Sequence, residues 1–206
     1  MKKFFTFIAA CMLTLSANAQ NGNVGEFTIQ PMVGITSTSA FNYSGEGVDT
    51  NHSAGYGFSV GADFGYRATD LFYPTVGAHY IQSKVNFGDE DVTTNNLAVP
   101  VLANFNVSGL RLGVGIQPTI NLNKSASKGL SLIEKSADAI KNTTFAIPVV
   151  AGYEMANGLT FEFRAAYDVT KSIDFNQVSS AVFNTLNKLQ TNNLTGMITI
   201  GYKFKL

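Results

Sequence analysis

The chain has 206 residues and carries 14 basic and 14 acidic side chains, so its formal net charge is zero. Charged residues make up only 14% of it, against about 25% in soluble domains, which argues against an ordinary water-covered surface. The neutral balance offers no basic footprint for nucleic acid, and none is expected as a partner. No apolar run reaches the roughly 18 residues that a membrane-spanning helix needs.

Residues 1–19 are predicted to be a cleaved signal peptide. Two lysines precede an apolar stretch over residues 4–15, and Ala17-Asn18-Ala19 is a small-residue cleavage site. The mature domain would then span residues 20–206, with 12 basic and 14 acidic side chains. The single cysteine, Cys11, leaves a lipoprotein signal as an alternative. Otherwise the mature chain has no cysteine, and no disulfide is expected.

Eight segments alternate between apolar and small or polar residues, which is the period of a β-strand. Most are about ten residues long, the length that a tilted strand needs to cross a membrane. They predict an all-β fold, an eight-stranded antiparallel up-and-down transmembrane barrel. The segments are Phe27–Ile35, Tyr56–Tyr66, Phe72–Tyr80, Leu97–Val107, Leu110–Leu122, Phe145–Tyr153, Leu159–Tyr167 and Leu194–Leu206.

The predicted connections alternate in length. Short links cover residues 67–71, 108–109 and 154–158, and long links cover about 37–55, 85–96, 123–144 and 170–193. Short periplasmic turns and long outer loops are typical of outer-membrane barrels, and an even strand number places both termini in the periplasm. Loops 37–55, 123–144 and 170–193 are therefore the expected contact surface for other outer-membrane proteins.

Two of the long loops contain helical patterns. Leu130, Ile133, Ala137 and Ile140 share one helix face, and Val178, Val182, Leu186 and Leu189 share another. We expect short helices in these outer loops. Their apolar faces would cap the barrel mouth or, alternatively, bind a partner or a lipid headgroup.

Alternation alone does not show which face is outside, because a soluble lipocalin-like barrel has the same period with its apolar face inward. Aromatic residues bracket several segments, as in the two girdles of a membrane barrel. The polar face is rich in glycine and poor in charge, which suits a narrow lumen. The chain also ends on an alternating strand, the signal read by the outer-membrane assembly machinery. These features favour an apolar face toward outer-membrane lipid.

The inward face should then hold the charged residues of the strands. Buried charges must be paired, because a lone one costs several kcal/mol. We expect Asp63 and Glu162 to meet Arg164 and Arg111 in a network that plugs the lumen. The full inward polar set is Asp63, Arg67, His79, Arg111, Gln117, Glu162, Arg164 and Asp168.

Three stretches resemble the PorT-like outer-membrane β-barrel proteins of Gram-negative bacteria: Asn96–Phe105, Leu112–Ile120 and Ile198–Phe204. In that family the first is a strand with a central proline, here Pro100, that opens a hairpin into a glycine-rich strand. The resemblance covers the mature chain and implies an eight-stranded outer-membrane barrel without catalytic residues or cofactors. One relative serves a protein-secretion system, but no residue here indicates that role.

Catalytic, cofactor and metal sites are not expected. His79 is interpreted as a member of the inward network, and His52 with nearby acids (Asp49, Asp89, Glu90 and Asp91) gives at best a loose cation site. We expect a non-enzymatic, plugged barrel that is a structural or accessory part of an outer-membrane assembly. The alternative is a barrel that handles lipid or a small ligand, including a lipid-modifying enzyme.

Overall fold

The computed structural model describes residues 24–41, 54–87, 90–126, 142–170 and 192–206. Within these ranges the chain forms ten strands, and no helix there is long and apolar enough to cross a membrane. The strands are β1 (Phe27–Phe41), β2 (Gly55–Tyr66), β3 (Phe72–Phe87), β4 (Glu90–Ala98), β5 (Val101–Val107), β6 (Leu110–Ala126), β7 (Thr143–Glu154), β8 (Leu159–Asp168), β9 (Asn192–Tyr202) and β10 (Phe204–Lys205).

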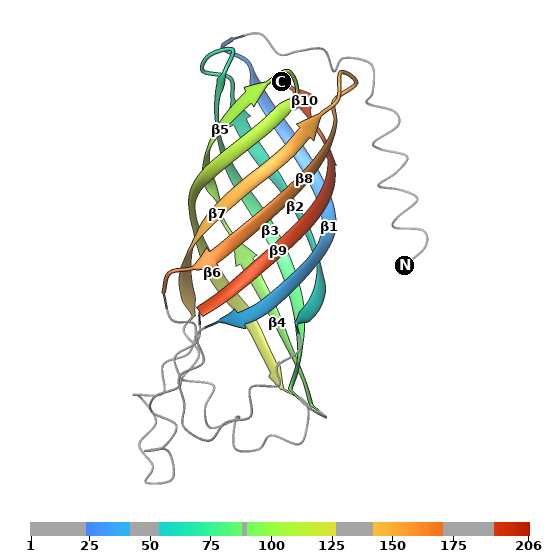
Figure 1. Cartoon of the computed structure of the whole chain (residues 1–206), viewed down its shortest axis with the longest axis vertical. Coiled ribbons are helices and arrows are strands. Elements are labelled where there is room, and N and C mark those ends of the chain that lie inside the picture. Colours follow the sequence, from blue (N-terminus) through green and yellow to red (C-terminus); the bar gives the residue numbers. More distant parts are fainter. Residues whose placement is uncertain (1–23, 42–53, 88–89, 127–141, 171–191) are drawn as a thin grey trace.

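The ten strands close into a barrel with eight wall positions (Figure 1). Neighbouring wall positions pair antiparallel in chain order, with β4 and β5 both lying between β3 and β6, and β1 closes the barrel by pairing with β9 and β10 as well as β2. Strands β4 and β5 share one wall position, interrupted at Val99 and Pro100, where proline has no N–H to donate. Strands β9 and β10 share another, interrupted at Lys203. The predicted eight-stranded antiparallel barrel is confirmed.

One end of the barrel, called the turn end here, carries the three short connections after β2, β5 and β7. The β5–β6 turn has Ser108 and Gly109 at positive φ (50° and 86°), as a two-residue type I′ hairpin requires. The Leu206 amide donates to the Phe27 carbonyl at 2.9 Å, so the last and first strands also meet at this end. The opposite end is called the loop end.

The loop end differs from the prediction at one hairpin. A long link was expected over residues 85–96, but β3 and β4 continue to a tight connection in which Phe87 pairs with Glu90. That expectation was wrong because mostly polar residues there hide the alternation. Strands β1 and β6 likewise extend into the predicted loops 37–55 and 123–144, to Phe41 and Ala126. The predicted signal peptide and loop helices lie outside the described residues.

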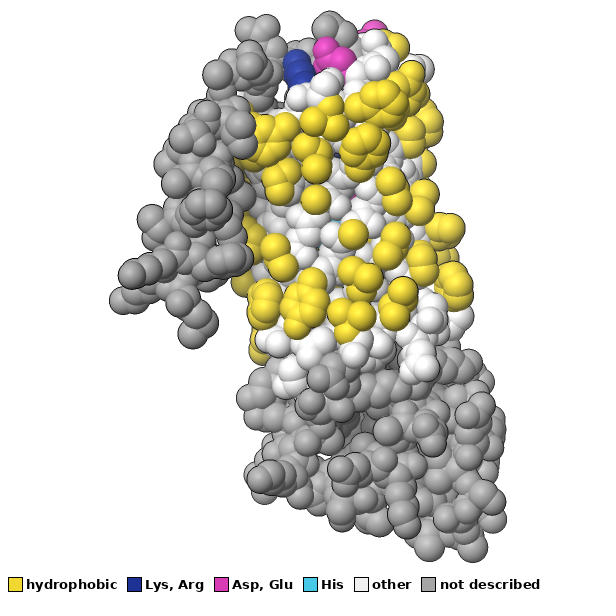
Figure 2. All heavy atoms as spheres, turned by 180° about the vertical axis from the view of Figure 1, so that it is seen from behind, with side chains coloured by type: hydrophobic (Ala, Val, Ile, Leu, Met, Phe, Trp, Pro, Cys, Tyr) yellow, Lys and Arg dark blue, Asp and Glu magenta, His cyan; other side chains and the backbone are white. Residues whose placement is uncertain are grey.

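The apolar face of the barrel points outward. Val149, Phe163 and Ile198 are more than half exposed, whereas Asp63 and Arg164 are almost completely buried. Hydrophobic side chains cover the wall and charged ones gather at the turn end (Figure 2). A soluble lipocalin-like arrangement is therefore excluded, and the outer face is suited to lipid.

Aromatic side chains band both ends of the outward face. At the turn end the Phe27 ring lies 4.9 Å from that of Tyr66, and at the loop end the Phe58 and Tyr80 rings lie 5.9 Å apart. Aliphatic residues such as Val60 lie between them on the same strand. This arrangement matches the two aromatic girdles of outer-membrane barrels.

The barrel interior has three levels. Charged and amide side chains fill the turn-end half. An apolar level follows, in which Ile81, Ala98 and Met197 form a buried cluster. Hydroxyl side chains lie beyond it toward the loop end, where Thr38 contacts Ser83 at 3.1 Å. Buried Ser59 and Thr36 lie at the same height, since they are the register partners of Ile81 and Met197.

The outward orientation predicts a depth-dependent effect of charge. Val149→Arg, in the middle of β7, should destabilise the barrel in lipid vesicles by about 2–4 kcal/mol, and Val107→Arg at the turn end by about 0–1 kcal/mol. Urea unfolding of both variants in vesicles measures the difference. Equal, near-zero effects would contradict a lipid-facing wall.

Candidate functional site

The strand alternation brings charged residues from four strands into the turn-end half of the lumen. Asp63 of β2 and His79 of β3 face inward on neighbouring strands, and both are buried. Their register partners are Gly77 and Gly61. Glu162 and Arg164 occupy successive inward positions of β8, and Arg111 enters from β6. All five side chains are at most 5% exposed.

Asp63 is the centre of the cluster. Its Oδ1 lies 2.7 Å from His79 Nε2, and its Oδ2 accepts from Arg164 Nη2 at 3.0 Å. The same Oδ2 lies 3.4 Å from Arg111 Nη2. One carboxylate thus contacts three other strands of the barrel, which ties opposite walls together.

Glu162 completes the charge balance. Its Oε1 accepts from Arg164 Nη2 at 2.7 Å and Nε at 3.1 Å, and its Oε2 lies 3.0 Å from Arg111 Nη1. Two carboxylates and two guanidinium groups therefore cancel. His79 Nε2 lies 2.7 Å from Asp63 Oδ1 and 3.4 Å from Arg164 Nη1.

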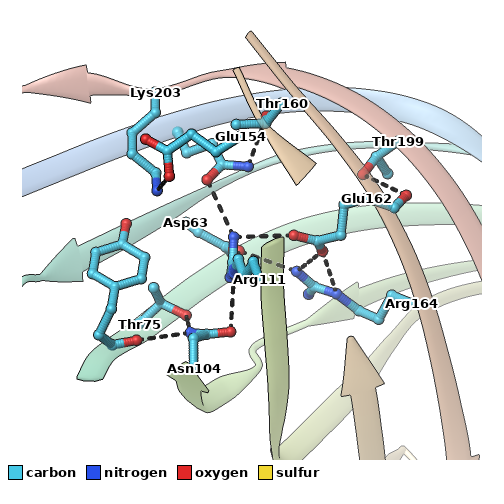
Figure 3. A network of polar contacts seen from close by, with 12 residues as sticks. Asp63, Thr75, Asn104, Arg111, Glu154, Thr160, Glu162, Arg164, Thr199 and Lys203 are labelled. Atoms are coloured by element: carbon cyan, nitrogen blue, oxygen red, sulfur yellow. Dashed lines mark hydrogen bonds and ion pairs between the residues drawn. The ribbon is translucent and has the colours of Figure 1, made fainter. Parts of the chain in front are cut away.

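Amide and hydroxyl side chains extend the network toward the turn end. Arg111 Nε donates to Asn104 Oδ1 at 2.9 Å and Arg111 Nη1 to Gln30 Oε1 at 3.2 Å (Figure 3). Asn104 in turn donates to Thr75 Oγ1, and Gln30 to Thr160 Oγ1, both at 3.0 Å. Every donor face of the Arg111 guanidinium thus has a partner.

Tyr73 and Lys203 close the network at the turn end. Lys203 Nζ pairs with Glu154 and lies 4.5 Å from the centre of the Tyr73 ring. The Tyr73 hydroxyl contacts Thr28 Oγ1 at 2.5 Å. A cavity with room for about one water molecule lies beside Arg111, Glu162 and Lys203.

Glycines make room for this network. A Cβ built at Gly77 would collide with Asp63 Oδ1 and His79 Nε2, and one at Gly113 with Asn104 Oδ1. Other inward glycines have a different neighbour: a Cβ at Gly57 or Gly115 would collide with the backbone of the adjoining strand.

Sequence reasoning missed several members of the network. The missed members on β1, β3 and β5 each follow or precede an outward apolar residue, and the alternation that predicted an inward Asp63 could also have predicted them. They are Gln30, Tyr73 and Asn104. Lys203 lies at a strand interruption, where parity is less informative.

Three residues of the predicted inward set lie apart from the cluster. Arg67 is half-buried at the turn end, where its Nη2 donates to the Asp70 carbonyl at 3.1 Å. Gln117 is buried toward the loop end, and its Nε2 donates to Thr119 at 3.4 Å. Asp168 is half-buried at the loop end of β8.

The arrangement is suited to holding the barrel together more than to chemistry. His79 and Asp63 form a base–carboxylate pair, but the other side chains that contact the pair are Arg164 and Arg111. No hydrogen bond from His79 to a hydroxyl or thiol occurs among the described residues. Across the described residues no cluster of three or more metal-ligating side chains occurs.

The balanced charges predict a large cost for removing one. Arg164→Met leaves Asp63 and Glu162 sharing one guanidinium, and should destabilise the barrel by about 3–5 kcal/mol because a buried charge loses its partner. Adding Glu162→Gln restores the balance, so the double variant should be more stable than the single one. Urea unfolding in lipid vesicles measures both.

Arg67→Met is the matched control. It removes the same side chain at the half-exposed turn end, so its effect should stay within about 0.5 kcal/mol. A cost for Arg164→Met as small as that of Arg67→Met would show that the ion network contributes little.

The chain was compared with known proteins, and no curated protein sequence matches it. Solved structures similar to it include Neisserial surface protein A (15% identity, 86% of this chain and 97% of that chain, TM-score 0.48) and the outer membrane protein OprG from Pseudomonas aeruginosa (15%, 91% and 99%, 0.46). A third is Ail, the attachment invasion locus protein of Yersinia pestis (14%, 88% and 100%, 0.42). Residues 7–204 match the sequence model described as the outer membrane protein beta-barrel domain, so the chain belongs to this family of outer-membrane barrels.

Proposed function

We propose that this protein is a closed, non-enzymatic outer-membrane barrel that acts as a structural or accessory component of a larger outer-membrane assembly. The observation that carries the proposal is the filled lumen. Asp63, His79 and Arg164 are each at most 1% exposed and bond to one another across the barrel axis. A water-filled path would have to break these contacts.

The level above the ion network supports the same conclusion. Ile81, Ala98 and Met197 are packed together and buried at 4% exposure or less. A solute entering from the loop end would meet this packed cluster before it reached the ion network. Eight strands leave an interior just wide enough for side chains, so transport through the lumen is disfavoured.

If the lumen is closed, the protein acts through its outer surfaces, which are the lipid-facing wall and the two ends of the barrel. We propose that the turn end and both chain termini face the periplasm, since short turns lie on that side of outer-membrane barrels. The loop end would then face the exterior and present the contact surface for partner proteins. The outer-membrane assembly machinery and lipid are the expected partners during insertion.

A lipid-modifying enzyme is the competing hypothesis. It would require a base reachable by substrate, and the His79–Asp63 pair is the candidate. Its burial and its bonds to Arg164 leave it unreachable from either leaflet in this conformation. His79→Ala would abolish a lipid-modifying activity if this hypothesis were right.

Planar-bilayer recording tests the closed lumen. The purified barrel should show no stable conductance above the lipid background, while a general porin inserted under the same conditions supplies the positive control. A large, steady conductance from the folded wild-type protein would overturn the closed-lumen proposal.

Cysteine labelling tests the contact surface and its side together. The mature chain is expected to lack cysteine, so Ser127→Cys in the segment between β6 and β7, and Ala156→Cys in the exposed turn after β7, are unique sites. With a membrane-impermeant maleimide crosslinker on intact cells, Ser127→Cys should react and capture a neighbouring protein, and Ala156→Cys should stay unlabelled. The reverse pattern would contradict the orientation, and a reactive Ser127→Cys without any captured protein would contradict the accessory role.

A further inference from the structure

The outward face near the loop end of β3 and β4 carries two paired amide side chains. Gln82 and Asn95 are register partners, and they face outward because the neighbouring Ile81 is buried inside. Toward the loop end the outward face of β6 stays apolar at exposed Ile120, whereas β1 and β7 carry outward Ser37 and Thr143. The β3–β4 flank is distinguished by its amide pair and by the hydrogen bonds that hold it.

Hydrogen bonds fix this polar flank. The Tyr80 hydroxyl donates to Asn95 Oδ1 at 2.8 Å, and Gln82 Nε2 donates to the same oxygen at 3.1 Å. Both bonds use only the oxygen of Asn95, so its NH₂ group can donate to a bound molecule. We call Tyr80, Gln82 and Asn95 the amide site.

A β-bulge lies beside the amide site. The β4–β6 register shifts between Asn95 and Asn96, whose partners are Asn123 and Asn121, so that Leu122 is the extra residue. In a regular ladder Leu122 would stand opposite Asn95. The bulge instead places Asn123 at the register position next to it. Bulges often occur at functional sites, where they change the strand register.

The height of the amide site indicates its surroundings. The Tyr80 ring packs against Phe58 in the loop-end aromatic girdle, and the next residues toward the barrel middle on this face, Ala78 and Leu97, are apolar. Amide groups inside hydrocarbon would cost several kcal/mol. The site therefore lies where acyl chains end and lipid headgroups begin.

We propose that the amide site binds the headgroup of an outer-leaflet lipid, with the Asn95 NH₂ group donating to a phosphate or sugar oxygen. A protein partner would need a broad patch of about 800 Å² on each side, whereas this site is a small polar spot within an apolar girdle. A headgroup supplies acceptor oxygens at the correct height. The inference rests on the proposed orientation of the barrel, but not on the closed lumen or on contacts through the loops.

Lipid retention measured by native mass spectrometry tests the proposal. The full-length mature barrel is released from detergent micelles that contain lipopolysaccharide, or dioleoylphosphatidylglycerol in a separate sample. The double variant Gln82→Leu/Asn95→Leu should retain about fivefold less lipopolysaccharide than wild type, the loss expected for one net hydrogen bond. A weaker effect on phosphatidylglycerol would assign the contact to the sugar, and an equal effect would assign it to the phosphate.

Two further variants keep the test decisive. Asn95→Asp preserves the acceptor for Tyr80 and Gln82 but replaces the NH₂ group with a negative oxygen, so it should lose lipid retention while the barrel still folds. Ser37→Val removes an outward hydroxyl on β1 and should change retention less than twofold. Folding is checked by the heat-dependent shift in gel mobility.

Three outcomes would overturn the proposal. Retention in the double variant could equal that of wild type, or Ser37→Val could reduce it as strongly. The double variant could also keep its lipid and lose a co-purifying protein, which would make the flank a protein contact. None of these outcomes bears on the conductance test of the closed lumen.

Discussion

The constraint on which the rest of the structure depends is that a sheet in hydrocarbon cannot leave a backbone edge unpaired. Strand β1 satisfies it by pairing with β2 on one side and with β9 and β10 on the other. Closure at eight wall positions then fixes a narrow interior. The strand alternation that covers the outside with apolar side chains must send the remaining side chains into that space. The two-residue alternation that places apolar side chains against lipid therefore also determines which side chains fill the lumen.

The narrow interior explains why its ionic residues are balanced and crowded among glycines. A charge in this environment is tolerated only with a partner of opposite sign, and Asp63, Glu162, Arg111 and Arg164 provide two of each. The bulk of the guanidinium groups and the Asp63–His79 pair leaves no volume for a Cβ at positions such as Gly77. Because Asp63 and Arg164 come from strands on opposite sides, the network adds cross-barrel links that the backbone ladder cannot supply.

Period-two alternation was enough to predict the strand number, the antiparallel order and the inward direction of Asp63, Glu162 and Arg164. It could not predict which inward residues touch, because the Asp63–Arg164 contact joins positions 101 residues apart and depends on the register of every strand between them. It also failed where apolar residues are few. The β3–β4 hairpin continues to Phe87 and Glu90 although its sequence reads as a loop, since backbone pairing with a neighbouring strand does not require an apolar face.

That same hairpin shows where the outward face changes character. Below Tyr80 the outward face of this hairpin is apolar, and at Gln82 and Asn95 it carries paired amides. Strands β1 and β7 also become polar toward the loop end, at Ser37 and Thr143, whereas Ile120 on β6 stays exposed and apolar. The end of the hydrocarbon therefore accounts for polar side chains at this height. It does not account for two hydrogen bonds that both end on the Asn95 oxygen and leave the NH₂ group available, which is the arrangement that a headgroup acceptor requires.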